Sequence, residues 1–220
     1  MPWHRWDLTV DEAIAVQREL AAQVRTTNDF DPDALRTVAG IDASYRDEGK
    51  ASVVVLSYPD LTVVEEATAT ARAEFPYVPG LLSFRESPLA LDALAKLSAL
   101  PDLLMLDGQG IAHPRRFGIA CHLGVLLDRP TIGVAKSVLT GKYEEPGEEP
   151  GSVSPLTYRG EVLGMAVRAK KRTNPLIVSV GHRIDLETAV RLVLACVRGY
   201  RLPETTRRAH NLAGGRSQRA

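Results

Sequence analysis

The chain has 220 residues, of which 45% are hydrophobic and 25% are charged, and its formal net charge is zero. This profile is typical of an ordinary soluble globular protein with room for one full core. It excludes a membrane-spanning chain, because the longest apolar runs, such as residues 52–56 and 103–106, are too short to cross a bilayer.

The first part of the chain predicts one helix and then a meander of antiparallel strands. Apolar residues recur with helical spacing over residues 9–26, with Thr9 as the cap. Three segments rich in β-branched residues follow, joined by short turns at 47–49 and 59–60. These predicted strands are residues 35–45, 51–58 and 61–71. A rigid loop with two prolines comes next, at residues 76–80.

From residue 88 onward, predicted strands alternate with helices, which implies parallel pairing through right-handed crossovers. The predicted helices are residues 88–100, 117–127, 185–197 and 203–212, and the predicted strands are residues 102–106, 131–135, 161–168 and 176–179. A surface loop is expected at 144–151 and a disordered tail at 213–220. We therefore expect a single α/β domain over residues 1–212, in which the antiparallel meander is extended by parallel strands and flanked by helices. RNase H-like nucleases share this arrangement with many other folds.

Asp42 lies in the middle of an otherwise apolar predicted strand. Strand alternation places it on the same face as Val38, Gly40 and Ser44. A carboxylate in this position costs several kcal/mol to desolvate unless it is paired or bound to a metal. The pattern fits a catalytic or metal-binding carboxylate, and it fits structural pairing or an edge strand equally well.

Asp107 closes the apolar run 103–106 and is followed by two glycines within three residues. This is typical of a catalytic position at the end of a buried strand, although an ordinary turn aspartate has the same pattern. On neighbouring strands, Asp42 and Asp107 would share one acidic pocket, where a divalent cation removes their mutual repulsion. Oxygen ligands favour Mg²⁺, with Mn²⁺ as a substitute, and such a site can activate water for attack on a phosphate.

The histidines after residue 100 and the two cysteines show no zinc-binding spacing. Cys121 and Cys196 have apolar neighbours in predicted helices, which favours buried thiols. His122, in the middle of a helix, is expected to be a packed or surface residue, whereas His113 adjoins the Asp107 loop and could contact phosphate or metal-bound water. Reduced thiols, together with the absence of an apolar signal segment after residue 5, indicate a cytoplasmic protein.

Charge is distributed unevenly along the chain. Residues 1–100 hold 9 Lys and Arg against 16 Asp and Glu, whereas residues 101–220 hold 18 against 11. A basic surface beside an acidic pocket suits a nuclease, since cations hold phosphates and carboxylates hold metal. The alternative is that these charges form solvated faces with no partner.

Five stretches of the chain resemble endonuclease V, the deoxyinosine-directed DNA repair nuclease. They are VAGIDASY at 38–45, FPYVPGLLSFRE at 75–86, PDLLMLDGQGIAHPRRFGIACHLGVLLDRPTIGVAKS at 101–137, NPLIVSVGHRI at 174–184 and GYRLPETTRRAH at 199–210. They follow one another in order over nearly the whole chain. The resemblance implies an RNase H-like, metal-dependent enzyme that binds damaged DNA. Such an enzyme hydrolyses the second phosphodiester bond 3′ to deoxyinosine and leaves 3′-hydroxyl and 5′-phosphate ends.

At matching positions, the resemblance implies that Asp42 and Asp107 bind metal and that Glu86 completes the acidic site. His210 would reach the site from the last helix, near the metal or the attacking water. Lys136 would neutralise phosphate charge near the scissile bond.

The resemblance also implies how the lesion is held. Tyr77, stiffened by Pro76 and Pro79, would be a wedge that fills the gap left by an everted base. The residues expected to line the hypoxanthine pocket are Gly80, Leu82, Gly108 and Leu139. Further contacts to DNA or the active site are expected from Arg85 and His113.

Other functions stay open at this point. A ribonuclease of the same fold could act on inosine in RNA, and a non-catalytic nucleic-acid-binding protein could have kept the fold. The intact carboxylates Asp42, Glu86 and Asp107 argue against a pure binder. A glycosidase with paired carboxylates is a remote alternative, which would need no metal. We expect the protein to act as a monomer.

Overall fold

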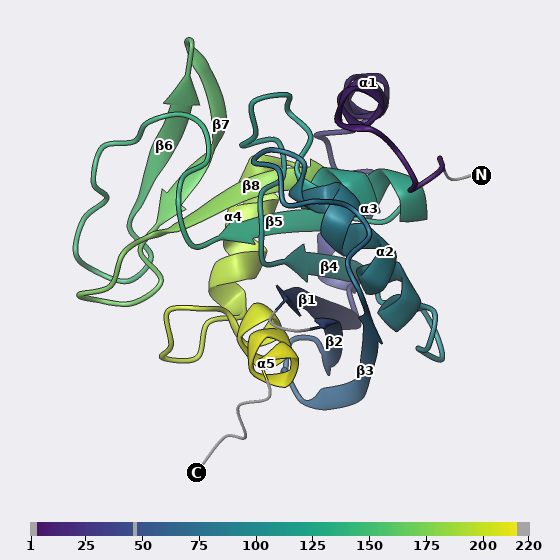
Figure 1. The fold of residues 1–220 in the computed structure, drawn as a ribbon. Helices are drawn as coiled ribbons and strands as arrows, with labels where there is room; N and C mark the ends of the chain where they lie inside the picture. The colour runs from purple at the N-terminus through teal and green to yellow at the C-terminus, as the bar shows by residue number, and fades with distance from the viewer. Residues whose placement is uncertain (1–3, 46–47, 215–220) are drawn as a thin grey trace.

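The computed structural model describes residues 4–45 and 48–214, whose strands form one mixed sheet of eight strands (Figure 1). Their spatial order is β3-β2-β1-β4-β5-β8-β7-β6. The strands are β1 (Thr37–Tyr45), β2 (Gly49–Ser57), β3 (Val63–Ala71), β4 (Leu103–Leu106), β5 (Thr131–Ala135), β6 (Val153–Tyr158), β7 (Glu161–Val167) and β8 (Leu176–His182).

Helices pack on both faces of the sheet. They are α1 (Val10–Ala21), α2 (Leu82–Leu94), α3 (Ile119–Leu127), α4 (Leu186–Ala195) and α5 (Glu204–Ala213), with a 3₁₀ turn, η1, at Pro32–Ala34. Helices α2 and α3 cover one face of the central strands, whereas α4 and α5 cover the other. Within the described ranges, no helix is long and apolar enough to cross a membrane.

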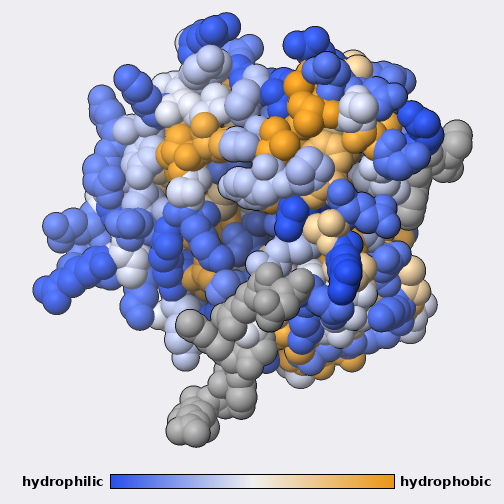
Figure 2. Space-filling model, in the orientation of Figure 1, coloured by the Kyte–Doolittle hydropathy of each residue, from blue (hydrophilic) through white to orange (hydrophobic). Residues whose placement is uncertain are grey.

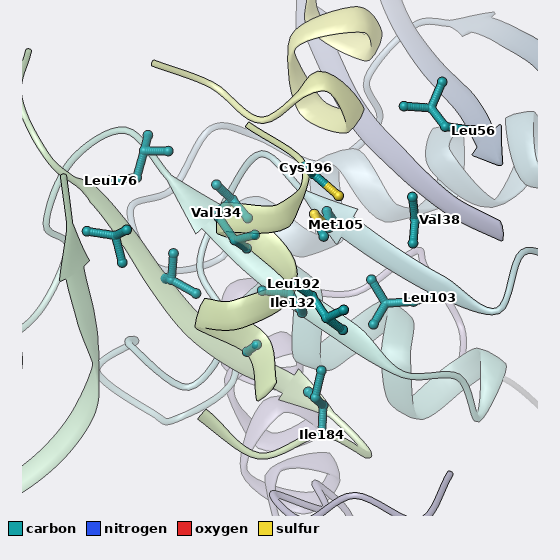
Figure 3. Packing of buried hydrophobic residues seen from close by; sticks show 14 of the residues in the cluster. Val38, Leu56, Leu103, Met105, Ile132, Val134, Leu176, Ile184, Leu192 and Cys196 are labelled. Atoms are coloured by element: carbon teal, nitrogen blue, oxygen red, sulfur yellow. The ribbon is translucent and has the colours of Figure 1, made fainter. Parts of the chain in front are cut away.

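The central strands are buried on both faces because nearly every position carries an apolar side chain. Val38 and Met105 belong to the core beneath α4 and α5, and Figure 3 shows them in one cluster of buried side chains with Leu192 of α4. Ala39 follows Val38 in β1, and Leu104 precedes Met105 in β4. Both belong to the core beneath α2 and α3. This two-sided burial explains why the strand sequences read as apolar runs.

Most of the predicted elements are confirmed. Thr9 caps α1 through a capping box with Glu12, and the three meander strands pair antiparallel as expected. Strands β1, β4 and β5 are parallel neighbours, which also agrees with the prediction. Cys121 and Cys196 are free and buried. Asp47, within one predicted turn, and residues 215–220 of the predicted tail lie outside the described residues.

Three predictions about the elements are wrong. Helix α2 begins at Leu82, six residues before the predicted start at Pro88, which lies within the helix. Strand β6 was missed because Pro155 and alternating exposure along an edge strand weaken its signal. The later strands were expected to pair in parallel, but beyond β5 the sheet continues with β8, β7 and β6, each antiparallel to its neighbour. No helix lies between β6 and β7 or between β7 and β8 along the chain.

Helix α5 lies unusually close to the sheet at Gly40. A Cβ atom at this position would lie 2.0 Å from the backbone oxygen of Thr205. No side chain can occupy that space, so the glycine lets the start of α5 rest directly on β1. Lys50 of β2 holds the other end of the helix, since its Nζ donates to the carbonyl of Leu212 at 2.7 Å.

Replacing Gly40 with alanine should destabilise the protein, because a backbone neighbour cannot move aside as a side chain can. We expect Gly40→Ala to lower the free energy of unfolding by about 2–3 kcal/mol, or roughly 5–10 °C in Tm. Thermal unfolding followed by circular dichroism measures this loss. The matched control is Gly160→Ala, where φ is +83° and nothing lies within 4 Å of the added atom. That variant should lose only about 1 kcal/mol, and equal losses in the two variants would contradict the account.

Candidate active site

Asp42 and Asp107 lie side by side at the point where the parallel pairing of β1 with β4 ends. Strands β1 and β4 pair in register up to Ile41 and Leu106, and the amide of Asp107 donates to the carbonyl of Ile41 at 3.0 Å. Asp42, within β1, and Asp107, directly after β4, therefore both lie one residue beyond the last pair. Both are nearly buried, with about 10% of each side chain exposed.

His210 and Lys136 bring the charges that face these carboxylates. His210 comes from α5, and its Nδ1 lies 2.7 Å from Oδ2 of Asp42. Lys136 directly follows β5, and its Nζ forms an ion pair with Oδ2 of Asp107. The Lys136 Nζ also lies 3.5 Å from Nδ1 of His210, so the four side chains form one continuous network.

Glu86 of α2 lines the same pocket as these four residues, together with Leu82. Burial and the neighbouring carboxylates Asp42 and Asp107 raise the pKa of Glu86 to about 8. Burial, and then the charge of Asp107, also raise the pKa of Asp42. The pocket therefore concentrates more negative charge than its single lysine offsets.

The side chains in this pocket fit a divalent cation. Ligand atoms of Asp42, Asp107 and His210 all lie within 4.8 Å of one another. Carboxylate oxygens and imidazole nitrogen are both common metal donors, and a cation would relieve the repulsion that raises the carboxylate pKa values. His210 is thus placed to act as a ligand, a role that strand periodicity could not indicate because the residue lies on a distant helix.

A second, smaller cavity of about 120 Å³ adjoins the acidic pocket, and Leu82 lines both. Tyr77, Gly80, His113 and Leu139, all singled out from the sequence, line this cavity. Tyr77 is 71% exposed and Leu139 is 45% exposed. On the face drawn in Figure 2, hydrophobic residues gather mainly in the upper half, and hydrophilic residues surround a hollow at the centre.

The carbonyl of Gly80 anchors one wall of this cavity. It accepts hydrogen bonds from Gln17 at 3.0 Å, from His113 at 3.0 Å and from Arg115 at 2.7 Å. Gly80 has φ of +81°, a left-handed conformation that favours glycine. Since Nδ1 of His113 accepts from the amide of Arg115 and its Nε2 faces Gly80, both ring nitrogens are engaged within the protein. Burial lowers the pKa of His113 to about 4, so the ring stays neutral.

Two of the expected binding residues lie away from both pockets. The guanidinium of Arg85 stacks 4.5 Å from the centre of the Tyr45 ring, and its Nη1 donates to the carbonyl of Phe75. Gly108 lies behind Ile119, whose Cγ2 would be 2.6 Å from an added Cβ. Gly108 therefore makes room for Ile119, which itself lines the small cavity.

Several residues that line the small cavity were missed from the sequence. They are Gln17, Val78, Pro79, Ser83, Gln109, Gly118 and Ile119. Gln17 had no distinguishing signal, because a polar residue within an amphipathic helix is ordinarily exposed, yet this side chain is buried. Ser83 lies in the first turn of α2, between the predicted loop at 76–80 and the predicted start of the helix at residue 88.

The basic half of the chain is only partly available to a ligand. Arg168 is buried and contacts Glu145 and the carbonyls of Pro146 and Gly147, so it fixes the surface loop at 144–151. Arg207 forms an ion pair with Glu204 and lies over the Tyr200 ring. Lys136 has 37% of its side chain exposed beside the acidic pocket.

Comparisons with known proteins agree with this geometry. The family model described as Endonuclease V matches residues 18–211. The chain belongs to the endonuclease V family. It is 53% identical over 216 residues to Endonuclease V of Nostoc sp., covering 97% of each chain. It is likewise 53% identical over 211 residues to that of Roseiflexus castenholzii, covering 96% of this chain and 94% of the relative.

Solved structures of endonuclease V share the fold. The enzyme from Streptomyces avermitilis superposes with a TM-score of 0.90 at 48% identity, covering 96% of this chain and 93% of the other. The Ciona intestinalis enzyme, solved with a 24mer DNA containing an inosine followed by a ribo-adenosine, has a TM-score of 0.81 at 33% identity. That match covers 94% of this chain and 96% of the other. The predicted RNase H-like fold is thereby confirmed.

The raised pKa of Glu86 has a consequence for stability in the absence of metal. The folded protein holds this proton up to about pH 8, whereas the unfolded chain releases it near pH 4.5. Stability contributed by protonated Glu86 is therefore lost progressively as the pH rises from about 5 to 8.

In EDTA, Glu86→Gln should lose less stability than wild type between pH 5 and pH 8, because the amide has no proton to release. For each kcal/mol of stability that Glu86→Gln keeps and wild type loses, the Tm values of the two proteins should differ by about 2–4 °C, and the difference should be largest near pH 8. Differential scanning fluorimetry across this range measures it. The control is Glu66→Gln, on the exposed side of β3, which should follow wild type. Parallel pH profiles for wild type and Glu86→Gln would contradict the raised pKa.

Proposed function

We propose that this protein cleaves DNA at the second phosphodiester bond 3′ to deoxyinosine and leaves 3′-hydroxyl and 5′-phosphate ends. The observation that carries the proposal is the adjacency of two pockets. One collects Asp42, Glu86, Asp107, His210 and Lys136, and the other is a small cavity with Tyr77 and Leu139 on its rim. Leu82 lines both, so a base held in the cavity would keep its backbone near the carboxylates.

The acidic pocket supplies the groups that phosphodiester hydrolysis requires. Asp42 and Asp107 would hold a divalent cation, which we propose to be Mg²⁺ with Mn²⁺ as a substitute. When bound, this ion supplies Lewis-acid chemistry at the phosphate. Glu86 completes the negative site. His210 is about half exposed and is held by Asp42, so a free ring nitrogen can accept a proton from an attacking water.

Lys136 would stabilise the negative charge that grows on the phosphate during hydrolysis. Its ammonium group already lies between Asp107 and His210, so it needs no large movement to reach the scissile bond. A cation fixed in advance costs little reorganisation in the transition state.

The small cavity suits a base that has been turned out of the helix. Tyr77 is exposed and lies between Pro76 and Pro79, so its ring can stack in the gap that the base leaves. Gly80, Leu82 and Leu139 line the cavity and would surround the everted hypoxanthine. Gly108 contributes indirectly by admitting Ile119, and His113 by holding the Gly80 loop. Arg85 would act outside the cavity, on DNA or by holding α2 against β1 through its contacts with Tyr45.

Inosine in RNA is the second candidate substrate. The Ciona relative was solved with an inosine followed by a ribo-adenosine, so an endonuclease V site can hold a ribose next to the lesion. We propose deoxyinosine in DNA as the main substrate, handled by a monomer whose catalytic domain spans residues 1–212 and which acts in the cytoplasm.

A nicking assay tests the function directly. Wild type with Mg²⁺ should cut a duplex with one deoxyinosine at the second bond 3′ to the lesion, and EDTA should abolish cutting. Asp42→Ala should reduce the rate by at least about 10³-fold, since it removes a metal ligand and the partner of His210. Asp92→Ala, an exposed carboxylate on α2, is the control and should cut normally. Binding without cleavage in Mg²⁺ and Mn²⁺ would favour the non-catalytic binder, and preference for a matched RNA would favour the ribonuclease.

A further inference from the structure

A chain of hydrogen bonds runs from the N-terminal segment to the wall of the small cavity. At its centre is His122 of α3, which has no exposed surface. Its Nε2 lies 2.7 Å from Nε2 of His4, and its Nδ1 lies 3.0 Å from Oγ of Ser83. Ser83 lies in the first turn of α2 and lines the cavity. Neither histidine has a part in the hydrolysis described above.

One contact determines where the hydrogens in this chain lie when both imidazoles are neutral. Nδ1 of His4 lies 2.5 Å from the carbonyl oxygen of Arg5, and because a carbonyl can only accept, this nitrogen carries a hydrogen. The Nε2 of His4 is then an acceptor, so the bond between the two rings requires a hydrogen on Nε2 of His122. Its Nδ1 becomes an acceptor in turn, and the hydroxyl of Ser83 donates to it.

With its hydrogen donated to His122, the hydroxyl oxygen of Ser83 can act only as an acceptor toward the cavity. Its one hydrogen is used by His122, and no described residue donates to its remaining lone pairs. The neighbouring carbonyl of Gly80 is different, because it already accepts from Gln17, His113 and Arg115. Another unused side-chain acceptor on the cavity wall is Oε1 of Gln109, which has no partner among the described residues.

We propose that Ser83 is a specificity-determining residue of the base pocket. Its oxygen accepts a hydrogen bond from a ring N–H of the everted base. It therefore favours 6-oxopurines, which carry a hydrogen at N1, over purines with a lone pair at N1. His122 and His4 are positioning residues that keep the serine hydroxyl turned away from the cavity. This inference rests on the proposed function, because it takes the cavity as the place of the base.

The test compares two duplexes that differ in one base, deoxyinosine or deoxynebularine, the latter with a lone pair at N1 and no 6-oxygen. The readout is the ratio of kcat/KM for the two duplexes at pH 8. Ser83→Ala should lower this ratio about tenfold, the effect of one hydrogen bond. Ser87→Ala is the matched control, since Ser87 is buried on the same helix and its hydroxyl has no partner among the described residues.

A second pair of variants tests the role of the histidine chain. His4→Phe keeps an aromatic ring beside Trp6 and Phe84 but removes the acceptor for His122, so the ratio should fall. His4→Gln restores an acceptor for His122 and should bring the ratio back toward its wild-type value. A purely structural role would slow both substrates equally and leave the ratio unchanged.

Nitrogen NMR of histidine-labelled protein checks the hydrogen positions without any substrate, and should find the His122 hydrogen on Nε2. A hydrogen on Nδ1 of His122 would overturn the inference. So would an unchanged kcat/KM ratio in Ser83→Ala, or a ratio that falls in Gln109→Leu instead. If wild type cuts the deoxyinosine duplex while Ser83→Ala keeps the ratio, only this inference fails. If wild type leaves that duplex intact, the proposed function fails and the inference fails with it.

Discussion

The direct contact between α5 and β1 at Gly40 is the constraint on which the site depends. Because residue 40 has no side chain, the backbone of Thr205 rests on the strand. Further along α5, His210 then reaches Asp42, which is 168 residues away in the chain. Any side chain at position 40 would lift the helix and separate the two. A packing requirement in the core therefore sets the geometry of the polar site above it.

The sheet supplies the other half of the arrangement. Parallel pairing of β1 with β4 brings Asp42 next to Asp107, and β5 beside β4 brings Lys136 to the same edge. Helix α2 adds Glu86 from the opposite face. The concentration of carboxylates is costly in the absence of a cation, which the raised pKa of Glu86 expresses. Rigid elements hold these groups together despite their repulsion, so the pocket can hold a divalent cation without rearrangement.

The sequence predicted the strands that carry the two aspartates, because apolar runs interrupted by a carboxylate are a strong local signal. The sequence also predicted the meander and most helices from periodicity. It could not predict the start of α2, since Pro88 has the same local signature at the first turn of a helix as it has within one. The roles assigned to Glu86, His210 and Lys136 came from family resemblance, since nothing in their local patterns distinguishes them. The neighbours of Gly80 and the chain through His122 depend on tertiary contacts between distant segments, which no local pattern encodes.

The most direct test of the account is a crystal structure of the wild-type protein with Mn²⁺ and an uncleavable deoxyinosine duplex, in which anomalous scattering locates the manganese. The account predicts a manganese peak bonded to oxygens of both Asp42 and Asp107, with the everted base in the cavity lined by Gly80 and Leu82. A peak away from these carboxylates, or a base that stays stacked in the duplex, would contradict it.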